Sequence, residues 1–294
     1  MHRIGALEGG GTKMVLGVFD EQGNELQRHT RPTLSPDETV PAMLRFFAEQ
    51  RIDALGIAMF GPLELHPDSP AYGCITTTPK LQWRHCNIVQ ALAGALHIPC
   101  ALETDVNAAA LAEAQVGAAR GLHDAVYITV GTGIGGGVLS GGNLVHGLLH
   151  PEVGHMLLRP HPDDPNPKGV CPYHDGCLEG LAAGPAIGAR VQGDARALHD
   201  DHPAFQLEAH YLAQMFVNLI LTVSPQRIIL GGGVMERKAL FPMIRKETQR
   251  LLNGYVQSPA VAEQIGEYIV PPALFPVSGL IGAYILGKQA LSAR

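Results

Sequence analysis

Residues 125–146 read AVYITVGTGIGGGVLSGGNLVH, and this stretch is the most informative about the fold. The apolar, β-branched run of residues 125–130 predicts a strand, which is followed by a glycine-rich turn at residues 131–137 and a second strand at residues 138–140. A polar turn at residues 141–143 then leads to a short third strand at residues 144–146. This order of strands and turns predicts two successive hairpins.

The same order of elements occurs at the start of the chain. Strands are expected at residues 4–7 and 14–19 around the glycines of residues 9–13, with a polar turn at 20–23 and a third strand at 25–31. After each hairpin set, helices and strands alternate. The helices are expected at residues 38–50, 88–96, 107–116, 207–223 and 238–252, and the strands at 54–59, 99–103 and 227–230. The pattern predicts an α/β protein with two lobes built on one plan.

Length and composition agree with two globular lobes. The chain has 294 residues, of which 46% are hydrophobic and 16% charged, and its net charge is −6 without a long basic run. Nucleic-acid binding is therefore not expected. No run of 18 apolar residues occurs, so no membrane partner is expected either. The five cysteines are an odd number and no signal peptide precedes the first strand, which together predict a reducing, cytoplasmic location without a disulfide framework.

The glycine turns are candidate phosphate-binding loops. Glycines let a phosphate approach backbone amides, and a hydroxyl adds a further donor. In the first turn the candidates are Gly10, Gly11, Thr12 and Lys13; in the second they are Thr132 and Gly133. Two such turns at matching places suit one nucleotide held from both sides, although plain hairpin turns remain an alternative. Gly231, Gly232 and Gly233 follow a buried strand and could admit an adenosine, or form a simple turn.

Asp105 is the candidate general base. It lies where a strand ends and a helix begins, the place where α/β sheets bind ligands. A carboxylate there can accept the proton of a sugar hydroxyl during phosphoryl transfer. The alternative is that Asp105 or Asn107 only caps the helix.

Two cysteines and two histidines predict a structural zinc site. Cys171, His174 and Cys177 occupy one tight loop, and His155 supplies a fourth ligand. His146, His150 and His161 are possible substitutes for His155, and a coincidental pair of reduced cysteines is the alternative to zinc. Glu152 and Glu179 lie beside these ligands, so the metal would hold both carboxylates for sugar hydroxyls, unless they are merely solvated.

The ordered set of motifs resembles the ROK family of sugar kinases and repressors, from residue 4 to about residue 287. The details resemble its fructokinases: Glu8 precedes the first glycines where the family more often has aspartate, and residues 76–83 read TTTPKLQW. His174 stands for a family cysteine in a loop one residue shorter. Thr104 stands where the family's glucokinases usually carry asparagine.

The resemblance implies two ribonuclease-H-like lobes of the actin-like ATPase fold with a cleft between them. Residues 1–116 and 277–294 would form the N-terminal lobe, and residues 117–276 the C-terminal lobe. The implied activity is ATP-dependent phosphorylation of a hexose, most simply fructose, at its 6-hydroxyl by a homodimer. The alternatives are a glucokinase, a mannokinase, an N-acetylhexosamine kinase or a catalytically silent sugar-binding regulator.

The resemblance also implies the residue roles. Asp105 would be the base, and Glu8 would hold Mg²⁺ through water. The nucleotide would contact Glu8, Gly10, Gly11, Thr12, Lys13, Thr132, Gly133, Pro185, Gly231, Gly232 and Gly233. The sugar would contact Thr104, Asp105, Glu152, His155 and Glu179. The cofactors would be Mg-ATP and a structural zinc held by His155, Cys171, His174 and Cys177.

Overall fold

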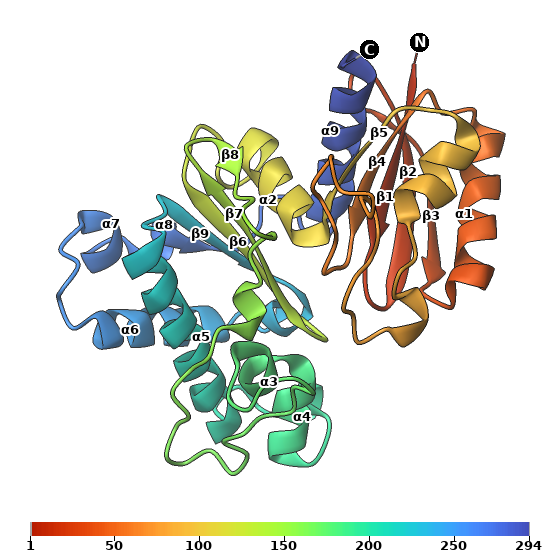
Figure 1. The fold of residues 1–294 in the computed structure, drawn as a ribbon. Helices are drawn as coiled ribbons and strands as arrows, with labels where there is room; N and C mark the ends of the chain where they lie inside the picture. Colours follow the sequence, from red (N-terminus) through yellow and green to blue (C-terminus); the bar gives the residue numbers. More distant parts are fainter. Residues whose placement is uncertain (1, 294) are drawn as a thin grey trace. The chain divides into compact units, whose positions relative to one another are not determined.

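The computed structural model describes residues 2–293, which group into two compact units (Figure 1). Unit 1 comprises Met1–Val116, Leu144–His150 and Leu274–Arg294, and unit 2 comprises Gly117–Asn143 and Pro151–Ala273. Met1 and Arg294, the outer limits of the expected N-terminal lobe, lie outside the described residues. No described helix is both long and apolar enough to cross a membrane.

Unit 1 contains a five-stranded sheet of order β3-β2-β1-β4-β5. Its strands are β1 (Arg3–Gly9), β2 (Lys13–Asp20), β3 (Glu25–Pro32), β4 (Ala54–Met59) and β5 (Cys100–Thr104). The first three strands pair antiparallel, whereas β4 and β5 run parallel to β1. This is the sheet that the first hairpin set and the following alternation of helix and strand predict.

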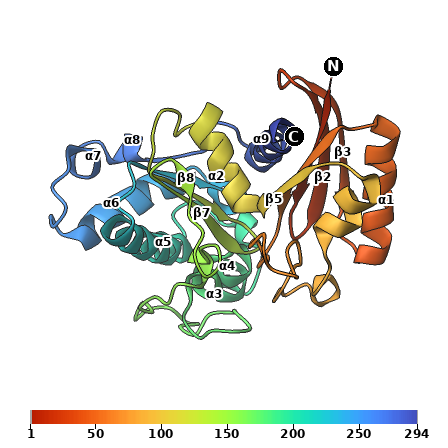
Figure 2. The same cartoon turned by 45° about the horizontal axis from the view of Figure 1, so that its top comes forward.

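Helices cover both faces of the unit 1 sheet, because its central strands are apolar on both sides. Figures 1 and 2 show α1 (Pro36–Gln50) on one face and α9 (Ser278–Ser292) on the other. Helix α2 (Asp105–Val116) packs beside α9. The approach of α9 to β4 requires a glycine, since a Cβ on Gly56 would lie 1.7 Å from the carbonyl oxygen of Ala283.

Unit 2 repeats the same strand order, as β10-β9-β6-β7-β8. Its strands are β6 (Ala125–Val130), β7 (Ile134–Ser140), β8 (Asn143–Leu144), β9 (Arg227–Gly231) and β10 (Ile269–Val270). Again the first hairpin is antiparallel and the two later strands run parallel to its first strand. The helices are α3 (Leu178–Ala182), α4 (Gly184–Val191), α5 (Pro203–Thr222), α6 (Leu240–Leu252), α7 (Pro259–Ala262) and α8 (Ile265–Tyr268).

The second glycine-rich stretch differs from its prediction. Only Gly131–Gly133 form the turn, because β7 already begins at Ile134. The later glycines belong to the strand and serve packing: a Cβ on Gly136 would lie 2.8 Å from Cδ1 of Ile128 and 2.9 Å from Cγ2 of Val153. The expected third strand is also shorter, since β8 ends at Leu144 and the chain then joins unit 1.

Two helices of unit 1 also differ from their predictions. The segment expected as an α-helix at residues 88–96 has a π-helical centre, η2 (Gln90–Gly94). Helix α2 begins at Asp105, two residues earlier than expected. Its start is stabilised by Thr104, whose Oγ1 accepts a hydrogen bond from the backbone N–H of Asn107 at 3.1 Å.

Candidate active site

The first glycine turn of unit 1 joins β1 to β2 and is held by β3 and the residue after it. The backbone N–H of Gly10 donates to the carbonyl of Lys13 at 2.9 Å. Thr33 donates its backbone N–H to the carbonyl of Thr12 at 3.0 Å and its hydroxyl to the carbonyl of Gly10 at 2.8 Å. Gly11, Thr12 and Lys13 are exposed. The turn therefore has a braced backbone and an open outer surface.

Two carboxylates lie close to this turn. Glu8 is at the end of β1 and Asp105 directly follows β5, and the registers Glu8–Ala58 and Ala58–Glu103 align these strand ends across β4. Burial raises the pKa of Asp105 to about 6, against hydrogen bonds from backbone amides that lower it. Burial and then the charge of Asp105 raise the pKa of Glu8 to about 7, against the opposing effect of Lys13. A divalent cation would stabilise both anions here, so the residues fit a magnesium site.

In unit 2, three of the segments predicted to bind nucleotide lie together. The backbone N–H of Gly131 donates to the carbonyl of Gly133 at 2.9 Å, and the N–H of Gly184 donates to the carbonyl of Gly131 at 2.8 Å. Gly184 begins α4, whose next residue is the exposed Pro185. Gly232 has φ 94°, and a Cβ there would lie 2.3 Å from the carbonyl oxygen of Val130. Gly131–Gly133, Gly184–Pro185 and Gly231–Gly233 thus form one backbone surface.

The four predicted zinc ligands form one cluster in unit 2. One ligand atom from each of His155, Cys171, His174 and Cys177 lies within 4.8 Å of the others. Cys171 Sγ is 3.9 Å from His155 Nδ1 and 3.8 Å from His174 Nδ1, and Cys177 Sγ is 3.8 Å from His155 Nδ1. Tetrahedral zinc with usual bond lengths needs sulfur and nitrogen roughly 3.6 Å apart, so the donor set and spacing fit this metal.

The three alternative histidines lie elsewhere. His146 pairs with Glu103 and His150 with the backbone of Leu63, both within unit 1. His161 packs against the ring of His210. His155 is therefore the histidine that the fold brings to the cysteine loop.

The cysteine loop leads directly into the helix that carries Glu179. Cys177 caps α3, since its Sγ accepts the backbone N–H of Gly180 at 3.4 Å. Glu179 then reaches the second glycine turn, where its Oε2 accepts the N–H of Ile134 at 2.9 Å. Glu152 is exposed just before His155, at the start of the 3₁₀ turn η3 (Val153–His155). The Cys/His cluster therefore lies directly beside the two segments that carry Glu152 and Glu179.

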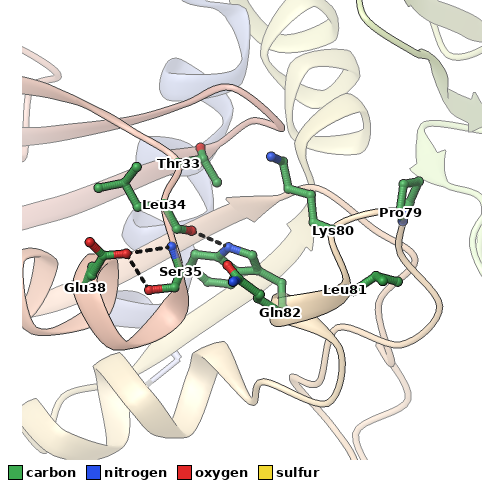
Figure 3. A pocket seen from close by; sticks show the side chains of 9 residues that line it. Thr33, Leu34, Ser35, Glu38, Pro79, Lys80, Leu81 and Gln82 are labelled. Carbon is green, nitrogen blue, oxygen red and sulfur yellow. Dashed lines mark hydrogen bonds between the residues drawn. The ribbon is translucent and has the colours of Figure 1, made fainter.

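Two residues beside the first glycine turn, Thr33 and Lys80, are not predicted as site residues from the sequence. A cavity of about 500 Å³ in unit 1 is lined by Thr33, Leu34, Ser35, Glu38 and residues 79–83 (Figure 3). The indole N–H of Trp83 donates to the carbonyl of Leu34 at 2.7 Å, and Lys80 Cε lies 3.6 Å from the position of a Cβ on Gly11. In the sequence, residues 76–83 indicate only a resemblance to the fructokinases of the ROK family. No local signal places Lys80 or Thr33 at the turn, because pairing and packing between distant segments bring them there.

Comparison with known proteins identifies the family. The chain is similar to fructokinases of Pediococcus pentosaceus (42% identical over 288 residues; 98% of each chain) and Zymomonas mobilis (43% over 297 residues; 97% of this chain and 96% of the relative). It also resembles a ROK family glucokinase from Streptomyces griseus solved with glucose and AMPPNP. That match has a TM-score of 0.76 and 26% identity, and covers 98% of this chain and 99% of the other.

These similarities confirm the predicted fold class, the actin-like ATPase fold with ribonuclease-H-like lobes. The model of the ROK family matches residues 4–290, which is nearly the whole chain. The chain therefore belongs to the ROK family.

Proposed function

We propose that the protein transfers the γ-phosphoryl group of ATP to the 6-hydroxyl of fructose. The observation that carries this proposal is the likeness to fructokinases over almost the full length of both chains. The position of Asp105 directly after β5 supports it. Both glycine turns and the Cys/His cluster also support the proposal.

Asp105 acts as the general base in this proposal. It accepts the proton of the sugar hydroxyl while the new O–P bond forms and the bond between the γ-phosphorus and the ADP oxygen breaks. A base works best with a pKa near the working pH, and burial has already raised the pKa of Asp105 to about 6. Mg²⁺ supplies charge neutralisation for the phosphates when bound. Glu8 would hold this ion, and Gly10, Gly11, Thr12 and Lys13 would hold the transferring group.

Unit 2 supplies nucleotide and sugar contacts. Thr132 and Gly133 donate to the phosphates, and Pro185 with Gly231–Gly233 accommodates the adenosine against the backbone. Glu152, His155 and Glu179 orient the sugar, together with Thr104 of unit 1. The hydrogen bond of Glu179 to the Ile134 amide couples the sugar contact to the second phosphate turn.

Zinc has a structural role in this proposal. The four-ligand site is closed, so the metal holds the loop between His155 and Cys177 rather than activating a water. Chelation or metal analysis tests this independently of activity. The proposal includes a homodimer, which sedimentation of the purified protein tests.

A panel of sugars with ATP tests the activity. ADP release is measured with fructose, glucose, mannose and N-acetylmannosamine at equal concentrations. We expect the highest kcat/KM with fructose. The product should be oxidised after phosphoglucose isomerase and glucose-6-phosphate dehydrogenase are added, because those enzymes consume fructose 6-phosphate and not fructose 1-phosphate. A higher kcat/KM with another hexose would move the assignment to that sugar, and no ADP release with any hexose would support a silent regulator.

A further inference from the structure

A short segment between the two runs of unit 2 is part of unit 1. The chain joins unit 1 at Leu144 and leaves it after His150; residues 144–150 are called the strap below. His150 is 6% exposed, and its Nε2 accepts the backbone N–H of Leu63 at 3.0 Å. His66 Nε2 lies 3.2 Å from the carbonyl oxygen of Leu148. The strap is thus docked at several points on unit 1.

A third docking point involves a buried carboxylate. Glu103 is 7% exposed, and its Oε1 lies 2.7 Å from Nε2 of His146 in the strap. Its Oε2 accepts a hydrogen bond from the side-chain amide of Asn107 at 2.9 Å. A buried carboxylate is costly unless its oxygens are hydrogen-bonded, and here both are. The hydrogen bond to Glu103 raises the pKa of His146, which favours the charged, stronger form of the pair.

The two partners of this network flank Asp105. Glu103 lies two residues before Asp105 in β5, and Asn107 lies two residues after it in the first turn of α2. The backbone N–H of Asn107 is also held by Thr104 Oγ1. The junction between β5 and α2 is therefore fixed on both sides of Asp105, and the bond from Glu103 to the strap is the part that comes from a distant segment.

We propose that His146 is a positioning residue for Asp105, acting through Glu103 and Asn107. The proposal rests on the role of Asp105 as base under the proposed function. Without the imidazole, the buried Oε1 of Glu103 loses its partner, and the carboxylate turns toward other donors and releases Asn107. Asp105 then samples positions away from the reacting hydroxyl, and a displacement of about 1 Å at such a site costs up to roughly 100-fold in rate.

The proposal predicts a specific kinetic pattern. His146 contacts neither sugar nor nucleotide in the proposed site, so its loss should lower kcat while the KM values for fructose and ATP stay within about twofold. A role in stability alone would lower the melting temperature without this change in kcat. The effects of His146 and Glu103 should also be non-additive, because they act as one unit.

A pair of isosteric variants tests the bond itself. The amide nitrogen of glutamine reaches the position of Nε2, whereas that of asparagine reaches only the position of Nδ1. We therefore expect H146N to lose about tenfold in kcat and H146Q to keep at least half of the wild-type value. H66A is the matched control, since His66 contacts the strap without touching Glu103, and its kcat should match wild type.

Several results would overturn the inference. Equal kcat for H146N and H146Q would exclude the Nε2 bond, and an equal loss in H66A would assign the effect to docking of the strap in general. In the double variant H146N/E103Q, additive losses would exclude action through Glu103. Wild-type protein without sugar kinase activity would instead reject the proposed function, so the two failures are distinguishable.

Discussion

Unit 1 and unit 2 have the same strand order, but the chain continues differently after the outermost parallel strand of each. In unit 1, β5 passes directly into α2, and this junction presents Asp105. In unit 2, β10 has two residues and is followed by Pro271 and Pro272, which cannot continue a ladder, and the chain then leaves for unit 1. The duplicated frame thus provides two glycine turns, whereas the proposed base lies in unit 1 alone among the described residues.

Replacing Asp105 tests that asymmetry most strongly. D105N keeps the shape of the side chain but removes the proton acceptor, so kcat should fall roughly 10²–10⁴-fold in the ADP-release assay. D124N is a control in unit 2, because the side chain of Asp124 accepts the backbone N–H of Gly141 at the hairpin turn after β7. Its kcat should stay within about twofold of wild type. Near-normal turnover of D105N would exclude Asp105 as the base.

Removing a proposed zinc ligand should affect unit 2 next most strongly. C171S removes the sulfur that lies near His155 and His174, so zinc content should fall and the loop should lose its anchor. A loss of a few kcal/mol lowers Tm by roughly 5–10 °C in a chain of this size. C74S in unit 1 serves as the control for loss of a thiol. Full zinc content by mass spectrometry in C171S would contradict the site.

A single methyl group tests the contact between the second glycine turn and Glu179. A Cβ on Gly133 would lie 2.6 Å from Glu179 Oε2, so G133A must displace this carboxylate. We expect kcat/KM for fructose to fall about tenfold, or about 1.4 kcal/mol. G266A, also in unit 2, meets no atom closer than 3.8 Å and should leave kcat/KM unchanged. If G133A had the kinetic constants of wild type, a role of Glu179 in the reaction would be excluded.

The titration of Asp105 affects activity and, as the smallest of the expected effects, Tm. Asp105 must be ionised to accept a proton, so kcat/KM should decline by about tenfold per pH unit below its pKa of about 6. Stability changes with pH in the direction opposite to activity. Because the pKa of Asp105 is raised in the folded protein, Asp105 contributes to the free energy of unfolding below the usual pKa of an aspartate, and this contribution is lost as pH rises through about 6. The Tm of D105N should therefore be higher than that of wild type at pH 8, and this difference should be smaller at pH 4. A constant difference in Tm across this range would refute the assigned pKa.

Much of the fold and some of the candidate site could be predicted. Local patterns were sufficient where one segment carries the whole signal: the hairpins around Gly10 and Gly133, and the loop from Cys171 to Cys177. The family and fold class predicted from these motifs are confirmed. Prediction failed at Gly136, because a glycine in a strand and a glycine in a turn look alike in sequence, and packing against Val153 decides between them. It also failed for residues 145–146, which were expected to belong to a strand that ends at Leu144.

Sequence patterns specify the alternation of strands and helices, the two glycine turns, the ligand types for a metal and the carboxylate at a strand end, since each depends on neighbours in the chain. The three-dimensional fold was needed to show that His155 rather than His146 joins the cysteines and that Glu179 contacts the second glycine turn. It was also needed to place Lys80 and Thr33 at the first glycine turn. The physical reason is that hydrogen bonds and ligand spheres form between residues that are close in space. Strand pairing and packing over the whole unit determine which residues come close, and a local sequence pattern does not contain this information.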